Sequence, residues 1–274
     1  MSLDDIHEAD LVFAVGLNPG TNMPRMLSAL EECKRNGGHV IAVNPLPEAG
    51  LIRFKNPQKV SGIIGRGTVI ADQFLHIKPG GDLALFQAIN ALVLQAEQAA
   101  PGTVLDHEFI DTNTTGFGEF AEHAERLSWP DVLEATGLSR DDIDQVVRRV
   151  LKTKKIIVCW AMGVTQQKYG VPTIREIVNV LMLRGALGRP GAGVCPVRGH
   201  SNVQGDRTMG IWEQMPQSFL DALQDEFGFT PPTKHGFDAV DSIRAMRDGR
   251  AKFFLGFASI FVRATPDSDQ TEQA

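Results

Sequence analysis

The 274-residue sequence predicts an α/β protein: a parallel sheet flanked by helices, with part of a second α/β lobe at the C-terminal end. Three observations predict this class. Apolar runs of strand length alternate with segments of helical periodicity. Glycine- and proline-rich turns separate many of these segments. Hydrophobic residues make up 43% of the chain, which is enough to bury one sizeable core or two modest ones.

The first strand, helix and strand lie between Leu11 and Asn44. The apolar run "LVFAV" is followed by the turn "GLNPGTN", and Gly37 and Gly38 end the helix that comes next. That helix is predicted by apolar residues at helical spacing: Met23, Met26, Leu27, Leu30 and Cys33. The buried run "HVIAVN" follows, so this unit predicts two parallel strands joined by a crossover helix and a Rossmann-like opening.

The next part of the chain is less regular. From Pro45 to Gly67 it is rich in proline, glycine and basic residues, which predicts a long excursion. The sequence "QFLHIK" predicts a short strand, and Asp82 opens an apolar helix. The segments "FGEFAEHAERL" and the one that begins at Trp129 predict two more short helices.

A second strand and helix repeat the first unit. The run "SRDDIDQVVRRVL" predicts a helix that begins with a capping box between Ser139 and Asp142. The buried strand "KIIVCW" and the turn "AMGVTQQKYGVP" come next. A helix capped by Thr173 and Glu176 is then predicted to run to about Arg184.

A glycine-rich stretch from Gly185 to Asp206 has little helical or strand periodicity, so we expect one lobe to pass into another there. We assign residues 1–199 to a Rossmann-like dinucleotide-binding lobe and residues 200–274 to an incomplete portion of a second α/β lobe. In the second lobe, "QSFLDALQDEFG" and "AVDSIRAMRDG" predict amphipathic helices, and "AKFFLGF" predicts a last strand.

Composition excludes several classes of partner. The net charge is -6 and no run of lysine or arginine is present, which argues against a nucleic acid. No apolar run is long enough for a membrane span, and the first residues do not resemble a signal peptide, so we expect a cytoplasmic protein. Cys33, Cys159 and Cys195 are far apart in sequence and include no C-x-x-C pair, which predicts reduced thiols and no iron–sulfur cluster in this chain.

The expected ligand site lies beyond the carboxyl ends of the strands, where "GLNPGTN", "NPLPE" and "MGVTQ" form three sides of one pocket. Gly16 and Gly20 would let backbone approach a phosphate, or they only form a tight turn. Asn44 would bind a ribose or close an Asn-Pro turn. Asp82 would bind a ribose or a guanine edge, or cap a helix. The fingerprint G-x-G-x-x-G is absent, which disfavours ordinary NAD binding.

A local excess of positive charge follows these segments. Between Arg184 and Arg207 four arginines stand against one acidic residue, which fits an anionic ligand near Arg198. The alternative is that Arg198 only satisfies carbonyls in an irregular loop. Cys195 and His200 lack a second ligand at metal-binding spacing, so no metal site is predicted.

Several segments resemble a known family in order and spacing. They are "AVGLNPGTNMPRM", "HVIAVNP", "LHIKPGGDLAL", "WAMGVTQQKYGVPTIREIVNVLMLRGALGRPGAGVCPVRGHSNVQGD" and the following "MG", and together they span about Val12 to Gly210. They are similar to the central part of molybdopterin oxidoreductases of the formate dehydrogenase alpha-subunit type. The resemblance implies a Rossmann-like lobe that grips one half of a bis-molybdopterin guanine dinucleotide (bis-MGD) cofactor, which carries molybdenum in the full-length protein.

The resemblance also implies roles for particular positions. Residues expected to approach the dinucleotide are Gly16, Asn18 and Pro19, with Asn44 near its ribose. Residues expected at the guanosine end are Gly81 and Asp82, and those along the pterin are Met162, Gly163 and Gln166.

Arg198 matches the arginine that stands beside molybdenum and an anionic substrate such as formate, where it would orient the carboxylate and stabilise charge. His200, the second expected catalytic residue, stands where a glutamine is expected, and Asn44 stands where an aspartate is usual. These two departures point to a small substrate other than formate.

The matching segments correspond only to the middle of longer enzymes. We therefore expect the isolated chain to be catalytically incompetent and to need the other lobes of the same polypeptide, together with a small-molecule substrate and a redox partner. An iron–sulfur cluster would belong to those other lobes. The alternative function is a stand-alone nucleotide-binding module without redox activity, similar to the middle domain of thiamine-dependent enzymes, which would bind adenine or flavin nucleotides.

Overall fold

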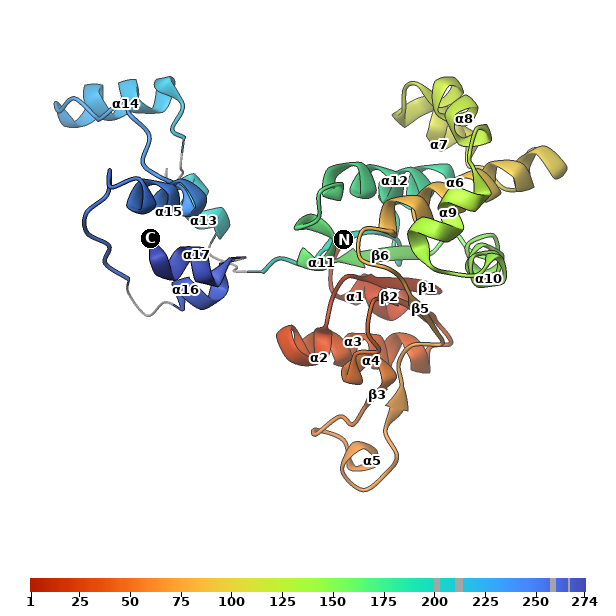
Figure 1. Cartoon of the computed structure of the whole chain (residues 1–274). Coiled ribbons are helices and arrows are strands. Elements are labelled where there is room, and N and C mark those ends of the chain that lie inside the picture. The colour runs from red at the N-terminus through yellow and green to blue at the C-terminus, as the bar shows by residue number, and fades with distance from the viewer. Residues whose placement is uncertain (200–202, 210–213, 257–259, 266) are drawn as a thin grey trace. The chain divides into compact units, whose positions relative to one another are not determined.

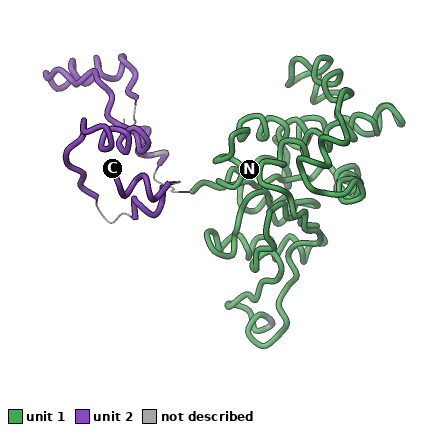
Figure 2. The backbone as a smooth tube through the Cα atoms, viewed as in Figure 1, with its two compact units in different colours: residues 1–199 green, residues 200–274 purple. Residues whose placement is uncertain are grey.

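A computed structural model of the chain describes residues 1–199, 203–209, 214–256, 260–265 and 267–274. The chain folds into two compact units, residues 1–199 and residues 200–274 (Figure 2). Among the described residues, no helix is both long and apolar enough to cross a membrane.

The first unit is built on a five-stranded sheet (Figure 1). Its strands, in spatial order, are β5 (Gln73–His76), β2 (His39–Asn44), β1 (Leu11–Val15), β6 (Ile156–Trp160) and β7 (Gly193–Pro196). All neighbouring pairs are parallel. The predicted α/β class with a parallel sheet flanked by helices is therefore confirmed.

Helices cover both faces of this sheet (Figure 1). Side chains alternate along each strand, so Phe13 and Val15 face one core while Val12 and Ala14 face the other. The first core is covered mainly by α6 (Asp82–Ala99), α10 (Arg140–Val150) and α12 (Gly170–Leu183). The second is covered by α1 (Asp4–Glu8), α3 (Pro24–Arg35) and α4 (Ala49–Ile52). Burial on both faces explains why the three central strands, β1, β2 and β6, are nearly continuous apolar runs.

Shorter helices complete this unit. They are α2 (Pro19–Asn22), α7 (His107–Asn113), α8 (Phe117–Glu125), α9 (Trp129–Thr136) and α11 (Met162–Thr165). The capping box predicted between Ser139 and Asp142 is confirmed at the start of α10.

The capping box predicted between Thr173 and Glu176 is wrong. The helix α12 begins earlier, at Gly170, and Thr173 lies inside it, where its hydroxyl donates to the Tyr169 carbonyl at 2.8 Å. The Glu176 carboxylate instead accepts a hydrogen bond from Asn90 Nδ2 on α6 at 2.7 Å. The pattern was misleading because a threonine inside a helix can bond to a carbonyl one turn back, which satisfies its hydroxyl without a helix start.

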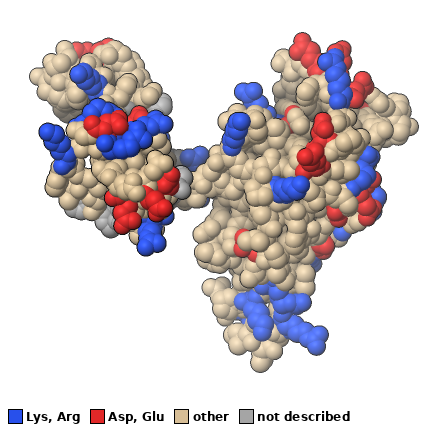
Figure 3. Space-filling view, in the orientation of Figure 1, with Lys and Arg blue, Asp and Glu red and all other residues tan. Residues whose placement is uncertain are grey.

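The predicted excursion forms an arm with its own short elements, β3 (Arg53–Phe54), α5 (Val60–Ile63) and β4 (Thr68–Val69). The two strands are antiparallel, and the arm extends from the sheet at the lower end of the view in Figure 1. The stretch from residue 49 to residue 71 contains four basic residues and no acidic one. Figure 3 shows basic side chains gathered at this end of the molecule.

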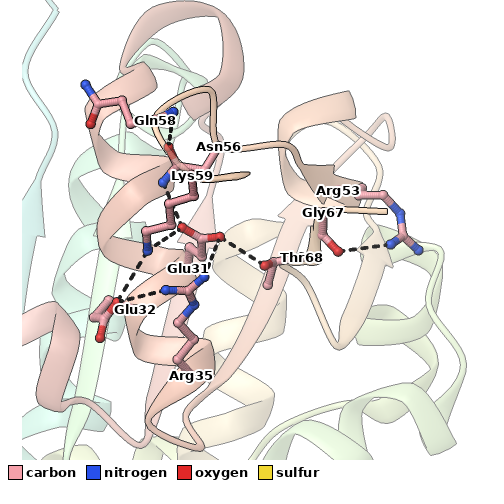
Figure 4. Close-up of polar contacts among 9 residues, drawn as sticks. All are labelled: Glu31, Glu32, Arg35, Arg53, Asn56, Gln58, Lys59, Gly67 and Thr68. Atoms are coloured by element: carbon pink, nitrogen blue, oxygen red, sulfur yellow. Dashed lines mark hydrogen bonds and ion pairs between the residues drawn. The ribbon is translucent and has the colours of Figure 1, made fainter. Parts of the chain in front are cut away.

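A buried carboxylate anchors the arm to α3 (Figure 4). Glu31 is 3% exposed and accepts hydrogen bonds from Asn56 Nδ2 at 2.8 Å, Lys59 Nζ at 3.0 Å and Thr68 Oγ1 at 3.1 Å. Burial alone would raise the pKa of Glu31, but these three donors lower it below its ordinary value. One ionised side chain therefore fixes both ends of the arm.

The regular secondary structure in the described part of the second unit is helical. The helices are α13 (Val203–Thr208), α14 (Gln217–Phe227), α15 (Ala239–Arg247), α16 (Phe261–Ala264) and α17 (Ser268–Gln273). The two amphipathic helices predicted for this part correspond to α14 and α15. The strand predicted at "AKFFLGF" is wrong over residues 251–256, which form neither helix nor strand. A strand needs a neighbour for its backbone hydrogen bonds, and the described residues of this unit offer none.

Candidate functional site

The loops that follow β1 and β6 meet at the carboxyl edge of the sheet. Gly16 follows β1 with a positive φ of 58°, and its carbonyl accepts a hydrogen bond from the Gly163 amide at 3.1 Å. A Cβ atom at Gly16 would lie 2.8 Å from the Gly163 carbonyl carbon. The two glycines therefore allow two backbone segments to pass in direct contact, which is a structural reason for glycine at both positions.

The loop after β1 is held by two amides. Asn18 precedes α2, where its Oδ1 accepts from the Thr21 amide at 3.2 Å and its Nδ2 donates to the Glu48 carboxylate at 2.5 Å. Pro19 is the first residue of α2 and is buried. Asn44, 5% exposed at the end of β2, donates from Nδ2 to the Leu17 carbonyl at 3.0 Å. Asn44 therefore joins the loops after β1 and β2.

Asp82 is a buried carboxylate at the start of α6. Gly81 takes the N-cap position and Asp82 is the first helical residue, so the alternative in which Asp82 caps the helix is wrong. Asp82 is 4% exposed, and its Oδ2 accepts a hydrogen bond from Gln167 Nε2 at 3.3 Å. Gln167 Nε2 also donates to the Gly163 carbonyl, so this side chain connects the Asp82 carboxylate to the loop after β6.

Gly81 has a packing role. A Cβ atom there would lie 2.7 Å from the Ala135 carbonyl oxygen near the end of α9. Its close approach is to this helix end, which accounts for the glycine without a ligand.

The segment around Met162 meets the end of the last strand. The Val197 amide donates to the Trp160 carbonyl at 2.8 Å, so the pairing of β6 with β7 continues up to the residue before Arg198. A Cβ atom at Gly199 would lie 3.3 Å from Met162 Sδ. Arg198 is exposed beside this contact. His200, the other expected catalytic residue, lies outside the described residues.

Gln166 occupies the end of α11. Its Nε2 lies 3.6 Å from Met162 Sδ, which is its own helix neighbour. The Gln166 side chain thus contacts only Met162 of its own segment after β6, among the hydrogen bonds described, while the adjacent Gln167 reaches Asp82.

The predicted positive patch is smaller than the sequence suggests. Arg184 is 3% exposed and donates to the carbonyls of Leu151 and Thr153 at 3.2 Å. Arg189 forms an ion pair with Asp106 at 3.2 Å. Two of the four arginines therefore stabilise the fold, and sequence proximity alone overcounted the charge available to a ligand near Arg198.

Gln167 and Glu48 are the residues that sequence reasoning missed. The chain has two adjacent glutamines in "TQQK", and it is Gln167, four residues after Gly163 and beyond the end of α11, whose side chain donates to the Gly163 carbonyl. The sequence alone does not distinguish it from Gln166. No sequence pattern predicted the hydrogen bond between Glu48 and Asn18, because the two residues are 30 positions apart and meet only in the folded chain.

The electrostatics of Asp82 give a testable prediction. Its pKa is raised because burial disfavours the carboxylate, and the hydrogen bond from Gln167 offsets this only in part. The Asp82 carboxyl therefore binds its proton more tightly in the folded protein than in the unfolded chain. As the pH rises above 3.8, the ordinary pKa of an aspartate, ionisation of Asp82 lowers the free energy of unfolding. We expect Asp82→Asn to raise the free energy of unfolding at neutral pH by on the order of 1 kcal/mol.

Urea denaturation at neutral pH and at about pH 3 checks this prediction. The gain from Asp82→Asn should disappear at the lower pH, where the wild-type side chain is protonated in both states. Asp111→Asn, at an exposed position on α7, is the control and should change stability little at either pH. A loss of stability in Asp82→Asn at neutral pH would mean that the helix dipole stabilises the charge more than burial penalises it.

Comparisons with known proteins define the class. The molybdopterin oxidoreductase family model matches residues 1–255, and the chain belongs to this family. An oxidoreductase of Mycobacterium tuberculosis, described as uncharacterized, is 53% identical over 274 residues, which cover 100% of this chain and 35% of that protein. The protein YdeP of Escherichia coli K12 is 39% identical over 272 residues, covering 97% of this chain and 36% of that protein.

Two further likenesses are more distant. Formate dehydrogenase H of Escherichia coli is 32% identical over 209 residues, covering 76% of this chain and 26% of that enzyme. The solved structure of acetylene hydratase from Pelobacter acetylenicus matches with a TM-score of 0.52 at 21% identity, over 69% of this chain and 25% of that one. The latter supports the fold alone. The chain thus corresponds to about a third of the length of its curated relatives.

Proposed function

We propose that this chain is the guanine-dinucleotide-binding portion of a larger molybdenum-dependent oxidoreductase that acts on a small, anionic substrate. The observation that carries the proposal is the meeting of the candidate loops at one edge of the parallel sheet. Gly16, Asn44 and Gly163 lie at the ends of three strands that are neighbours in that sheet. In open α/β sheets this edge is where ligands bind, at the point where the strand order changes direction.

The change of direction lies between β1 and β6. The strand that follows β1 in sequence, β2, lies on one side of it, and β6 lies on the other. The helices that follow β1 and β6 cover opposite faces of the sheet. The loops after these two strands therefore lead to opposite faces from the contact between Gly16 and Gly163. A dinucleotide laid across this point would contact both loops.

Asp82 fits the guanine end of such a ligand. Its buried carboxylate has a neutral hydrogen-bond donor, Gln167, and none of the ion pairs described for this chain involves it. Guanine carries adjacent N–H donors on its ring and its exocyclic amine, and a carboxylate accepts from two such donors at once. The amide of Gln167 would rotate away to admit the base.

Arg198 would serve the other end of the site. It is exposed, follows the last strand and stands next to Gly199, which packs against Met162. A guanidinium there would hold a carboxylate or similar anion through paired hydrogen bonds. The bis-MGD molybdenum centre supplies two-electron oxidation and reduction when it is bound. The described residues contain no group of three metal-ligating side chains.

The chain alone is proposed to bind nucleotide weakly and to lack turnover. It spans 35% of the length of the M. tuberculosis relative, so the remaining part of such a protein would supply the rest of the cofactor site. Formate dehydrogenase H shares 32% identity, and that distance leaves the substrate open to small anions other than formate.

Calorimetric titration of the purified chain with GDP tests the proposal, and separate titrations with ADP and NAD serve as controls for guanine selectivity. We expect selective binding of GDP with a Kd on the order of 0.1–1 mM. Asp82→Asn should weaken GDP binding at least tenfold, about 1.4 kcal/mol, because an amide presents N–H groups toward the N–H donors of the base. ADP binding should not depend on this residue.

Asp111→Asn, at an exposed position of α7, is the matched control and should bind GDP as the wild type does. Preference for ADP or NAD would favour a stand-alone nucleotide-binding module. GDP binding that survives Asp82→Asn would remove Asp82 from the site, and a complete lack of binding would contradict a nucleotide site carried by this chain alone.

A further inference from the structure

The fold brings together two cysteines that are far apart in sequence. In the parallel pairing of β6 with β7, Cys159 stands opposite Cys195. Neighbouring strands lie about 4.8 Å apart, so the two Cα atoms are within the range of about 4.4–6.8 Å that a disulfide spans. Both side chains point to the same face, since Cys159 belongs to the core beneath α3 and Cys195 packs against that core.

The two thiols have different environments. Cys159 is 0% exposed, whereas Cys195 is half-buried on β7, the last strand of the described sheet. The hydrogen bond between the two thiols lowers the pKa of Cys195 and, together with burial, raises the pKa of Cys159. Cys195 is the more exposed sulfur, and its lowered pKa makes it the one that ionises first.

We propose that Cys159 and Cys195 form an oxidation site at which a hydroperoxide converts the thiol pair into a disulfide. The Cys195 thiolate attacks one peroxide oxygen and the O–O bond breaks, which forms a sulfenic acid on Cys195; the hydroxide or alkoxide that leaves takes up the proton that the Cys195 thiol had lost and departs as water or an alcohol. The Cys159 thiol then attacks the Cys195 sulfur, the S–O bond breaks and water leaves. Two thiols are oxidised by two electrons, and one peroxide O–O bond is reduced.

Cys33 is the third cysteine and provides an internal control. It is 0% exposed on α3, its thiol donates to the Ala9 carbonyl at 3.4 Å, and burial raises its pKa to about 11. A thiol that is both buried and protonated reacts slowly with peroxide. Cys33 therefore stays reduced while the pair reacts.

The resulting disulfide should be easily reduced. A disulfide brings the two Cβ atoms to about 3.8 Å, closer than the spacing of about 4.8 Å between paired strands, so the sheet must adjust locally. Strained disulfides have higher reduction potentials than unstrained ones. The bond would tie the edge strand to β6 just before the chain reaches Arg198, where Val197 makes the last backbone hydrogen bond to β6.

The test treats the whole reduced chain with a small excess of hydrogen peroxide under native conditions, then blocks remaining thiols with an alkylating reagent and maps peptides by mass. We expect the three thiols to fall to one, with Cys159 and Cys195 in one linked peptide and Cys33 alkylated. Dithiothreitol should restore all three. Recovery of three alkylated thiols after treatment would overturn the proposal, as would a linkage that includes Cys33.

Variants identify the order of events. Cys33→Ser should still form the linked peptide, whereas Cys195→Ser should form none. Cys159→Ala should leave Cys195 as a sulfenic acid that dimedone captures, and Cys159→Ser repeats this test if the smaller side chain disturbs folding. Dimedone capture on Cys159 in the Cys195→Ser variant, at the rate of Cys195 in Cys159→Ala, would contradict the assigned order of attack.

Discussion

Gly163→Ala is expected to lower the free energy of unfolding by about 2–4 kcal/mol, because the new methyl group would meet backbone on the facing loop. A Cβ atom at Gly163 would lie 2.5 Å from the Gly16 carbonyl oxygen and 2.6 Å from its Cα atom. Backbone atoms cannot move aside as a flexible side chain can, so the two loops must separate. Urea denaturation followed by circular dichroism measures the change.

Gly118→Ala is the matched control for this substitution. Gly118 lies on α8, and a Cβ atom there has no neighbour within 4 Å, so alanine should leave stability unchanged or raise it slightly. Equal stability of Gly163→Ala and Gly118→Ala would show that the loops after β1 and β6 tolerate separation. Loss of the close contact between Gly16 and Gly163 would then not lower the free energy of unfolding.

Glu31→Gln is expected to lower the free energy of unfolding by about 2–4 kcal/mol and to release the arm. The substitution removes the charge that Lys59 Nζ approaches at 3.0 Å and turns one of two accepting oxygens into a donor. Because the folded pKa of Glu31 is lowered, its contribution is present at neutral pH and is lost as the pH falls through that lowered pKa.

Glu32→Gln tests whether the effect belongs to the buried position. Glu32 is the next residue of α3, is 41% exposed and forms ion pairs with Arg35 and Lys59 at 3.9 and 3.8 Å. Exposed pairs of this kind contribute little, so its loss should change stability by less than about 0.5 kcal/mol. Limited trypsin digestion should cut the arm of Glu31→Gln faster than that of Glu32→Gln, and equal rates would contradict an anchoring role.

The central strands β1, β2 and β6 could be predicted because they are buried on both faces. The edge strand β7 was not predicted, because it lies in the glycine-rich stretch from Gly185 to Asp206, where no strand periodicity is visible. Runs such as "LVFAV" and "IIVCW" carry no polar residue, and the turns after them contain glycine. The same signal failed at "AKFFLGF", where residues 251–256 form no strand. An apolar run predicts that a segment is buried. A strand also needs a neighbouring strand to pair with, and the apolar run does not identify one.

The candidate site could be predicted in its general location and less well in its contacts. The strand-end rule grouped Gly16, Asn44 and Met162, and these residues do end or follow three neighbouring strands at one edge of the sheet, whereas ligand binding there stays a prediction. The hydrogen bond from Gln167 to Asp82 joins positions 85 apart in sequence, and no local sequence pattern predicts it. The burial of Arg184 escaped prediction for the same reason, since its acceptors are carbonyls contributed by distant loops.

The crossing of the two loops at Gly16 and Gly163 has a thermodynamic consequence. The loop after β1 leads to the helical layer on one side of the sheet, and the loop after β6 leads to the layer on the other. Any molecule held by both loops therefore joins the two layers, and the free energy of its binding adds to their cohesion. Folding of this unit and occupancy of the candidate site would then be linked equilibria, so a molecule bound there would raise the free energy of unfolding of this unit.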